Sequence, residues 1–90
     1  MQRIVVVTGA NRGIGREVAR QLAVRGDLVV LGSRDPAKGE TAAAELARAG
    51  AEVLPRHLDV TDPATLQRLA EELAGRHGRL DVLVNNAAVL

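Results

Sequence analysis

The sequence contains no cysteine and no aromatic residue, and these absences exclude several classes of protein. Without cysteine there can be no disulfide framework and no thiolate metal site, and nothing indicates secretion. Without phenylalanine, tyrosine or tryptophan, the hydrophobic core has to consist of valine, leucine, isoleucine and alanine. No apolar run approaches the ~20 residues of a membrane-spanning helix, and the chain does not start like a signal peptide. We therefore expect a cytoplasmic protein with no membrane partner.

A marked excess of one charge is also lacking. The 90 residues include 12 basic and 11 acidic ones, a formal net charge of +1, so the balance gives no electrostatic argument for a nucleic-acid partner. The two histidines, His57 and His77, have no second ligand at metal-site spacing, so we expect no metal. Apolar residues make up 47% of the chain, which is too many for a disordered segment. The length allows one small domain over residues 1–90.

Apolar runs and amphipathic segments alternate along the chain. Strands are predicted over four runs: Arg3–Thr8, Leu28–Gly32, Glu52–Leu58 and Leu80–Asn85. Pro55 interrupts the third run, and because proline lacks the N–H that a central strand needs, we expect an edge strand there.

Helices are predicted between these runs. The first has an apolar face formed by Ile14, Val18, Ala19, Leu22 and Ala23 and ends at Gly26. The second begins at Asp35-Pro36 and ends at Gly50, and the third begins at Asp62-Pro63. In both Asp-Pro pairs the aspartate is suited to cap the helix and the proline to occupy its first position. This β-α-β-α-β-α-β order predicts an α/β fold with right-handed crossovers and a parallel sheet covered by helices.

The segment Thr8-Gly9-Ala10-Asn11-Arg12-Gly13-Ile14-Gly15 carries the strongest functional signal. It lies between a strand and a helix, where backbone N–H groups and the helix dipole can bind a phosphate. Gly9 would let the chain leave the strand in a tight turn, and Gly13 would let the backbone approach a pyrophosphate. Gly15 would make room where the helix crosses the first strand. The spacing is Gly-x3-Gly-x-Gly, not the commoner Gly-x-Gly-x2-Gly.

This segment resembles the cofactor fingerprint of the short-chain dehydrogenase/reductase superfamily. Three further elements follow in the family's order: Leu58-Asp59-Val60, Leu80-Asp81-Val82-Leu83-Val84 and Asn85-Asn86-Ala87-Ala88. The last is similar to the family's Asn-Asn-Ala-Gly, with alanine in place of the glycine. Together the matches span nearly the whole chain, and they are most similar to carbonyl-reductase-type members.

The resemblance implies a Rossmann-type doubly wound parallel sheet with strand order 3-2-1-4, ending here after the fourth strand. In such a sheet the strand order reverses between the first and fourth strands, and a ligand would bind outside the carboxyl ends of these two strands. Thr8 could then hydrogen-bond to the loop after the fourth strand, although a β-branched residue in a strand needs no such role. The implied dinucleotide site comprises Thr8, Gly9, Asn11, Arg12, Gly13, Ile14, Gly15, Ser33, Arg34, Asp59, Val60, Asn86 and Ala87.

Two residues of this set have specific implied roles. By the resemblance Asp59 binds the adenine amino group, helped by the Val60 backbone; the alternative is an ordinary surface turn residue. Asn86 resembles the residue whose backbone or side chain meets the cofactor ribose. Its neighbour Asn85 is expected to brace the sheet.

The choice between NADP and NAD depends on the end of the second strand. An NAD site places an acid there, about 20 residues past the glycines. Asp35 meets this spacing, but a helix cap explains it, and the family's selecting acid would align nearer Ser33. Basic residues at the positions of Arg12 and Arg34 bind the 2′-phosphate of NADP in similar members. NADP is therefore the expected cofactor, although both arginines could be solvated loop charges.

The residues for catalysis in this family are absent. Its members transfer a hydride between the nicotinamide and a carbonyl or alcohol substrate, using a Tyr-x3-Lys pair that follows the fourth strand. This sequence has no tyrosine, and its one lysine is Lys38. We expect the cofactor-binding, N-terminal part of a longer oxidoreductase. The alternatives are a free-standing, non-catalytic nucleotide-binding module and an interaction fragment that self-associates through its exposed sheet edge.

Overall fold

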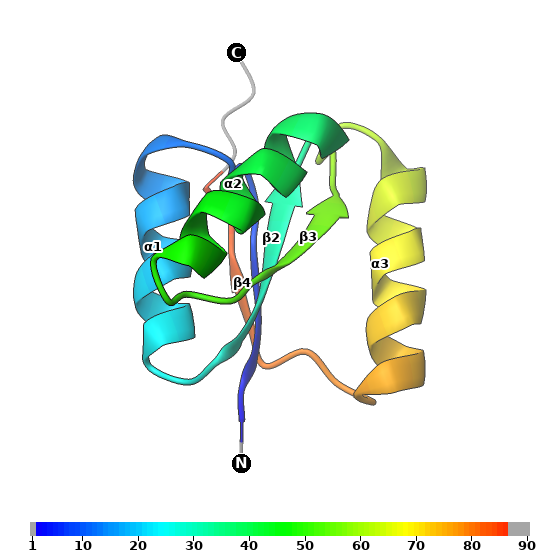
Figure 1. Cartoon of the computed structure of the whole chain (residues 1–90). Helices are drawn as coiled ribbons and strands as arrows, with labels where there is room; N and C mark the ends of the chain where they lie inside the picture. Colours follow the sequence, from blue (N-terminus) through cyan, green and yellow to red (C-terminus); the bar gives the residue numbers. More distant parts are fainter. Residues whose placement is uncertain (1, 87–90) are drawn as a thin grey trace.

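The computed structural model describes residues 2–86 and contains a single parallel sheet between two layers of helices (Figure 1). The strands are β1 (Ile4–Val7), β2 (Leu28–Ser33), β3 (Leu54–His57) and β4 (Val82–Val84). The helices are α1 (Gly13–Val24), α2 (Pro36–Arg48) and α3 (Pro63–Arg76). The sheet order is β3-β2-β1-β4, and all three pairings are parallel. The predicted fold class, element order and strand order are confirmed.

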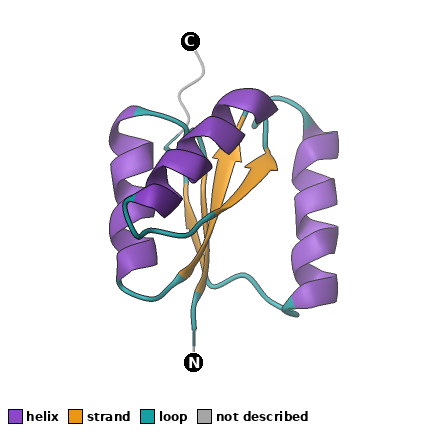
Figure 2. Ribbon diagram, viewed as in Figure 1, coloured by secondary structure: helices purple, strands orange, loops and turns teal. Residues whose placement is uncertain are grey.

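The two faces of the sheet carry separate hydrophobic clusters, because successive strand residues point to opposite sides. Val5 and Val7 of β1 lie in the cluster that also contains Ala19 of α1 and Leu46 of α2. Ile4, Val6 and Val30 lie in the other cluster, with Leu69 and Leu73 of α3. Helices α1 and α2 therefore cover one face and α3 the other, as the ribbon colouring makes clear (Figure 2).

The helix boundaries follow the predicted capping residues. The Asp35 carboxylate accepts hydrogen bonds from Ala37 N and Lys38 N at the start of α2, and Asp62 accepts one from Ala64 N at the start of α3. Gly26 and Gly50 follow the ends of α1 and α2 with φ of 100° and 86°, values that favour glycine.

The strands are shorter than predicted at three of the four positions. β3 begins at Leu54, and Glu52 lies exposed before it. β4 has three residues and, among residues 2–86, one strand neighbour. The last predicted residues of β1 and β3, Thr8 and Leu58, belong to the loops that follow, whereas β2 extends one residue further than predicted, to Ser33. The prediction that β3 is an edge strand, made from Pro55, is confirmed.

One predicted core residue is not in the core. Ile14 is 77% exposed because it lies in the first turn of α1, beyond the end of the sheet. The rest of the expected α1 face, from Val18 to Ala23, does pack against the sheet.

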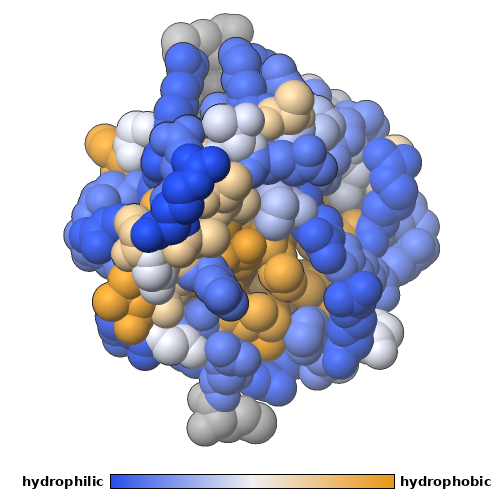
Figure 3. Space-filling model, viewed as in Figure 1, coloured by the Kyte–Doolittle hydropathy of each residue, from blue (hydrophilic) through white to orange (hydrophobic). Residues whose placement is uncertain are grey.

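Helix α3 is also held to β3 by charge. Arg56 donates to both carboxylate oxygens of Glu72 at 2.7–3.0 Å, and this hydrogen bonding holds the pKa of Glu72 below its ordinary value. The surface seen in the direction of Figure 1 has apolar residues near its middle, surrounded by hydrophilic ones (Figure 3).

Candidate functional site

The four loops that follow the strands lie at one edge of the sheet, since parallel strands all point the same way. Strand β1 leads into the glycine loop at Thr8, and β4 leads into Asn85 and Asn86. The strand order reverses at this pair: from β1 the sheet extends to β2 and β3 on one side and to β4 on the other. In an open parallel sheet, ligands bind outside the carboxyl ends of the strands at such a point. This edge is the expected position of a ligand site.

The glycine loop has the backbone geometry that its sequence predicts. Gly9 and Gly13 have φ of 60° and 63°, a left-handed conformation that other residues rarely adopt. Arg12 is the N-cap of α1 and makes no side-chain capping bond. The N–H groups of the first turn are therefore not capped from within the helix, and they can receive an anion.

Gly15 makes room for a loop rather than for a strand. A Cβ at this position would lie 2.5 Å from Asn86 Nδ2 and 2.8 Å from the Gly9 carbonyl oxygen. The close approach predicted for Gly15 is present, but its partners are the residues just after β1 and β4.

Thr8 joins the two loops, as predicted. Its hydroxyl accepts a hydrogen bond from Asn86 N at 2.9 Å and lies 3.2 Å from Asn85 Oδ1. Asn86 Nδ2 in turn donates to the Gly9 carbonyl at 3.3 Å. Asn85 and Asn86 thus both contact Thr8, and the side chain of Asn86 also holds the glycine loop through its hydrogen bond to Gly9. Ala87, the last residue of the predicted set, lies outside the described residues.

Asp59 and Val60 are half-buried in the turn after β3. Asp59 Oδ1 accepts from the backbone N–H and the hydroxyl of Thr61, at 2.9 and 2.6 Å. These two bonds are the main reason that the pKa of Asp59 lies below its ordinary value, and Arg34 and His57 add smaller electrostatic contributions. The carboxylate is therefore ionised at neutral pH and suited to accept a further hydrogen bond.

Ser33, the last residue of β2, is buried, whereas the next residue, Arg34, is exposed to solvent. Ser33 is fully buried, and its hydroxyl donates to the Asp35 carbonyl at 2.7 Å. Gly39 packs directly on it: a Cβ on Gly39 would lie 2.8 Å from Ser33 Cβ. The Ser33 side chain therefore points into the fold, whereas Arg34 is exposed and forms no hydrogen bond or salt bridge with residues 2–86.

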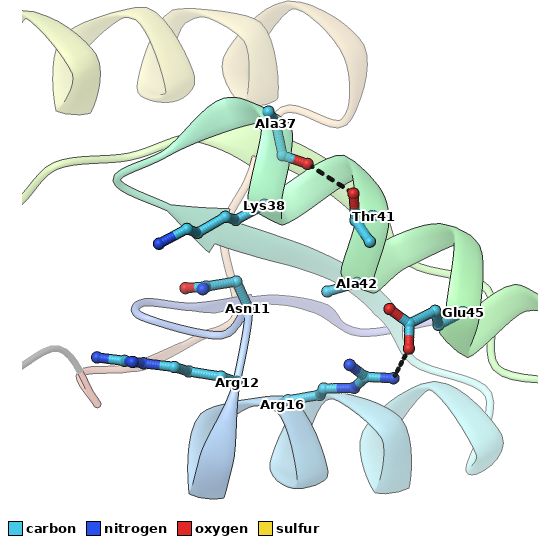
Figure 4. Close-up of a pocket in the computed structure, with 8 residues that line it drawn as sticks. All are labelled: Asn11, Arg12, Arg16, Ala37, Lys38, Thr41, Ala42 and Glu45. Carbon is cyan, nitrogen blue, oxygen red and sulfur yellow. Dashed lines mark hydrogen bonds and ion pairs between the residues drawn. The ribbon is translucent and has the colours of Figure 1, made fainter.

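A cavity of about 340 Å³ opens between the glycine loop and α2 (Figure 4). Asn11, Arg12 and Lys38 extend toward the same side of this cavity, while Arg16 and Glu45 face each other on the other side. The Arg16 guanidinium lies 3.3 Å from the Glu45 carboxylate and is thereby compensated. The side chains of Arg12 and Lys38 form no salt bridge within residues 2–86.

Lys38 is a candidate site residue that the sequence analysis missed. It lies in the first turn of α2, three residues after the capping Asp35, and helix geometry directs it toward the glycine loop. The available signal was its position: the chain's one lysine occurs four residues after Arg34. Asn11, Arg12 and Lys38, with Arg34 nearby in sequence, form a cationic and polar surface that suits a phosphate group.

The described residues offer neither a metal cluster nor a membrane span. Residues 2–86 contain no group of three or more histidine, aspartate or glutamate side chains placed to hold a metal ion. No helix within these residues is both long and apolar enough to cross a membrane.

Comparison with known proteins agrees with this geometry. The family model described as short chain dehydrogenase matches residues 3–90. The chain is 50% identical to a (+)-neomenthol dehydrogenase from Arabidopsis thaliana, covering 97% of this chain and 31% of that protein. It is 48% identical to a salutaridine reductase from Papaver somniferum, covering 98% of this chain and 29% of that protein.

Solved structures give the same result. Menthone neomenthol reductase from Mentha piperita superposes with a TM-score of 0.93 at 42% identity, over 99% of this chain and 32% of that one. A metagenomic short-chain oxidoreductase in complex with NADP has a TM-score of 0.85 at 41% identity, over 97% of this chain and 39% of that one. The chain thus spans about a third of the length of these relatives. It belongs to the short-chain dehydrogenase family.

Proposed function

We propose that this chain is the dinucleotide-binding part of an NADP-dependent short-chain oxidoreductase, which transfers a hydride between NADPH and a carbonyl or alcohol substrate. The observation that carries the proposal is a pair of side chains without a salt bridge within residues 2–86, Arg12 and Lys38, beside a glycine loop with an uncapped helix start. Arg34, which also forms no salt bridge there, directly follows β2 at the same edge of the sheet. The NADP complex of a relative with 41% identity supports the same choice. NAD is the less favoured cofactor because the one acidic side chain that lines this cavity, Glu45, is paired with Arg16.

Each part of the proposed site has a separate task. The N–H groups at the start of α1 bind the pyrophosphate, and Gly13 lets the backbone approach it. Arg12, Arg34 and Lys38 bind the 2′-phosphate. Asp59 and the Val60 backbone bind the adenine, and Asn86 and Ala87 bind the cofactor ribose. The cofactor supplies the hydride; residues 1–90 bind and orient it, as one domain of a cytoplasmic protein.

Calorimetry with purified protein tests the cofactor choice. We expect NADPH to bind about ten- to a hundredfold more tightly than NADH, the range given by one charge-assisted hydrogen bond to the 2′-phosphate. Equal or reversed affinities would contradict the proposal.

A non-catalytic nucleotide-binding module is the second candidate function. The absence of tyrosine favours it for the 90-residue chain, because no side chain offers the family's proton donor. We expect this chain to bind NADPH without reducing any aldehyde or ketone. Turnover above background would show that a proton donor has been overlooked.

We also propose that the 90-residue chain self-associates through β4. This strand has one neighbour among residues 2–86, and Leu83 on it is 59% exposed. An apolar edge strand is a template for pairing with a second copy. Light scattering after size exclusion should detect dimers or larger species that Leu83→Lys reduces. Val24→Lys is the matched control, since Val24 is equally exposed but lies at the end of α1. A monomer at high concentration would contradict this proposal.

A further inference from the structure

Thr65 holds the turn that carries Asp59. This threonine is 1% exposed, although it lies in the first turn of α3, and its hydroxyl has three close partners. Its oxygen accepts a hydrogen bond from Asp59 N at 3.0 Å and lies within donating distance of two carbonyl oxygens, that of Asp59 at 3.0 Å and that of Asp62 at 2.8 Å. One buried hydroxyl thus fixes the backbone on both sides of Asp59.

A second threonine fixes the Asp59 side chain. The backbone N–H and the hydroxyl of Thr61 both donate to Oδ1 of Asp59. No group within residues 2–86 donates to the other oxygen, Oδ2. The carboxylate is therefore held in one orientation with a single oxygen available, as a selective acceptor requires.

We infer that Thr65 and Thr61 are positioning residues that aim Oδ2 of Asp59 at the exocyclic amino group of the adenine base. The inference rests on the proposed function, which places Asp59 against the adenine. The pair makes the site selective for a base that donates a hydrogen bond at this position. A base that carries an oxygen there would meet a fixed carboxylate and be disfavoured.

A merely structural role for Thr65 would give a different result. The side chain of Asp62 already caps α3, and two of the three hydroxyl contacts of Thr65 go to the backbone of Asp59. The third goes to the Asp62 carbonyl. Loss of a purely structural contact lowers the stability of the fold and weakens the binding of every nucleotide to the same extent. Loss of a positioning contact changes the preference between two bases, because it alters the direction of one acceptor.

The test compares NADPH with its hypoxanthine analogue, in which oxygen replaces the adenine amino group. Binding of both by the 90-residue chain is measured by calorimetry. Asp59→Asn should reduce the preference for NADPH by about ten- to a hundredfold, since the bond lost involves a charge. Thr65→Val should reduce it by about two- to tenfold, the range for a neutral hydrogen bond. Thr65→Ser retains the hydroxyl and should keep the preference.

The outcomes separate this inference from the proposed function. If Asp59→Asn leaves the preference unchanged, the proposed adenine contact is wrong, and the inference falls with it. If Asp59→Asn reduces the preference but Thr65→Val and Thr61→Val do not, only the inference is overturned. Thr61 is exposed, so Thr61→Val decides the matter should Thr65→Val fail to fold. Gln67→Ala, on the exposed side of α3, is the control that should change neither affinity.

Discussion

The two ends of the sheet are held in opposite ways. At the amino ends of the strands, charges are paired within the chain: Arg3 lies 2.8 Å from Asp27, and Arg79 lies 3.0 Å from Asp81. The Asp81 carboxylate also accepts the backbone N–H of Ile4 at 2.7 Å. At the carboxyl ends, the side chains of Arg12, Arg34 and Lys38 form no salt bridge within residues 2–86. One end satisfies its charges internally, and the other leaves cations for an external anion.

This difference separates residues that stabilise the fold from those that bind. Exposed ion pairs contribute about 0–1 kcal/mol each to stability. The stability of the amino end therefore depends more on the Asp81 carboxylate, which accepts the backbone N–H of Ile4 in place of a strand carbonyl. At the carboxyl end, Arg12 and Lys38 form no salt bridge within residues 2–86, and Arg34 makes only a minor electrostatic contribution at Asp59, which is the pattern expected of a binding surface. Changes to the paired charges at the amino end should therefore alter stability, whereas changes to the cations without a salt bridge at the carboxyl end should alter ligand affinity.

The largest effect is expected from two adjacent residues that lie in different environments. Ser33→Asp puts a carboxylate into a fully buried position against Gly39, and we expect a loss of roughly 3–5 kcal/mol in the free energy of unfolding. The variant should not acquire NAD preference, because the acid would not reach the ligand. Arg34→Asp should leave stability nearly unchanged but abolish discrimination in favour of NADPH. Urea denaturation and calorimetry on both variants check this; a stable, NAD-preferring Ser33→Asp would contradict it.

The close contact of Gly15 predicts the next largest effect. Gly15→Ala brings a Cβ against the Gly9 carbonyl and Asn86, an overpacking that costs about 1–3 kcal/mol. It should also weaken nucleotide binding by displacing the glycine loop. Gly75→Ala in α3 is the matched control, because its Cβ would have no atom within 4 Å apart from its chain neighbours and the backbone of its own helix, and alanine stabilises a helix by about 0.5–1 kcal/mol. Equal destabilisation by the two changes would rule out a special contact at Gly15.

A smaller effect at the amino end depends on pH. The hydrogen bond from Ile4 N, and then Arg79, lower the pKa of Asp81 in the folded chain. A depressed pKa contributes stability above the unfolded value of 3.8, and this contribution is lost as the pH falls through the folded value. Asp81→Asn should therefore flatten the decline of stability below about pH 4. Glu40→Gln, at an exposed position with no salt bridge within residues 2–86, should leave that slope unchanged.

Local patterns predicted most of the fold. The alternation of apolar runs and helices, the two Asp-Pro caps and the proline in β3 each act through neighbouring residues, and the structure agrees with all three. The bond from Thr8 to the loop after β4 was also predictable, because adjacent parallel strands bring their carboxyl ends together.

Contacts between distant segments were harder to predict. Burial of Ser33 depends on Gly39 of α2 packing against the end of β2, and the exposure of Ile14 depends on how far α1 extends beyond the sheet. Lys38 enters the candidate site because the first turn of α2 faces the glycine loop. The spacing within one segment does not contain this information, since each case is decided by the position of a second element.

The central claim is that the uncompensated cations at the carboxyl end hold a 2′-phosphate. Phosphorus NMR of bound 2′,5′-ADP tests it directly, because the second pKa of a phosphate monoester is about 6 and nearby cations lower it. We predict that binding lowers the pKa of the 2′-phosphate, and that Arg34→Ala restores part of the shift. An unchanged 2′-phosphate pKa in the complex would contradict the account.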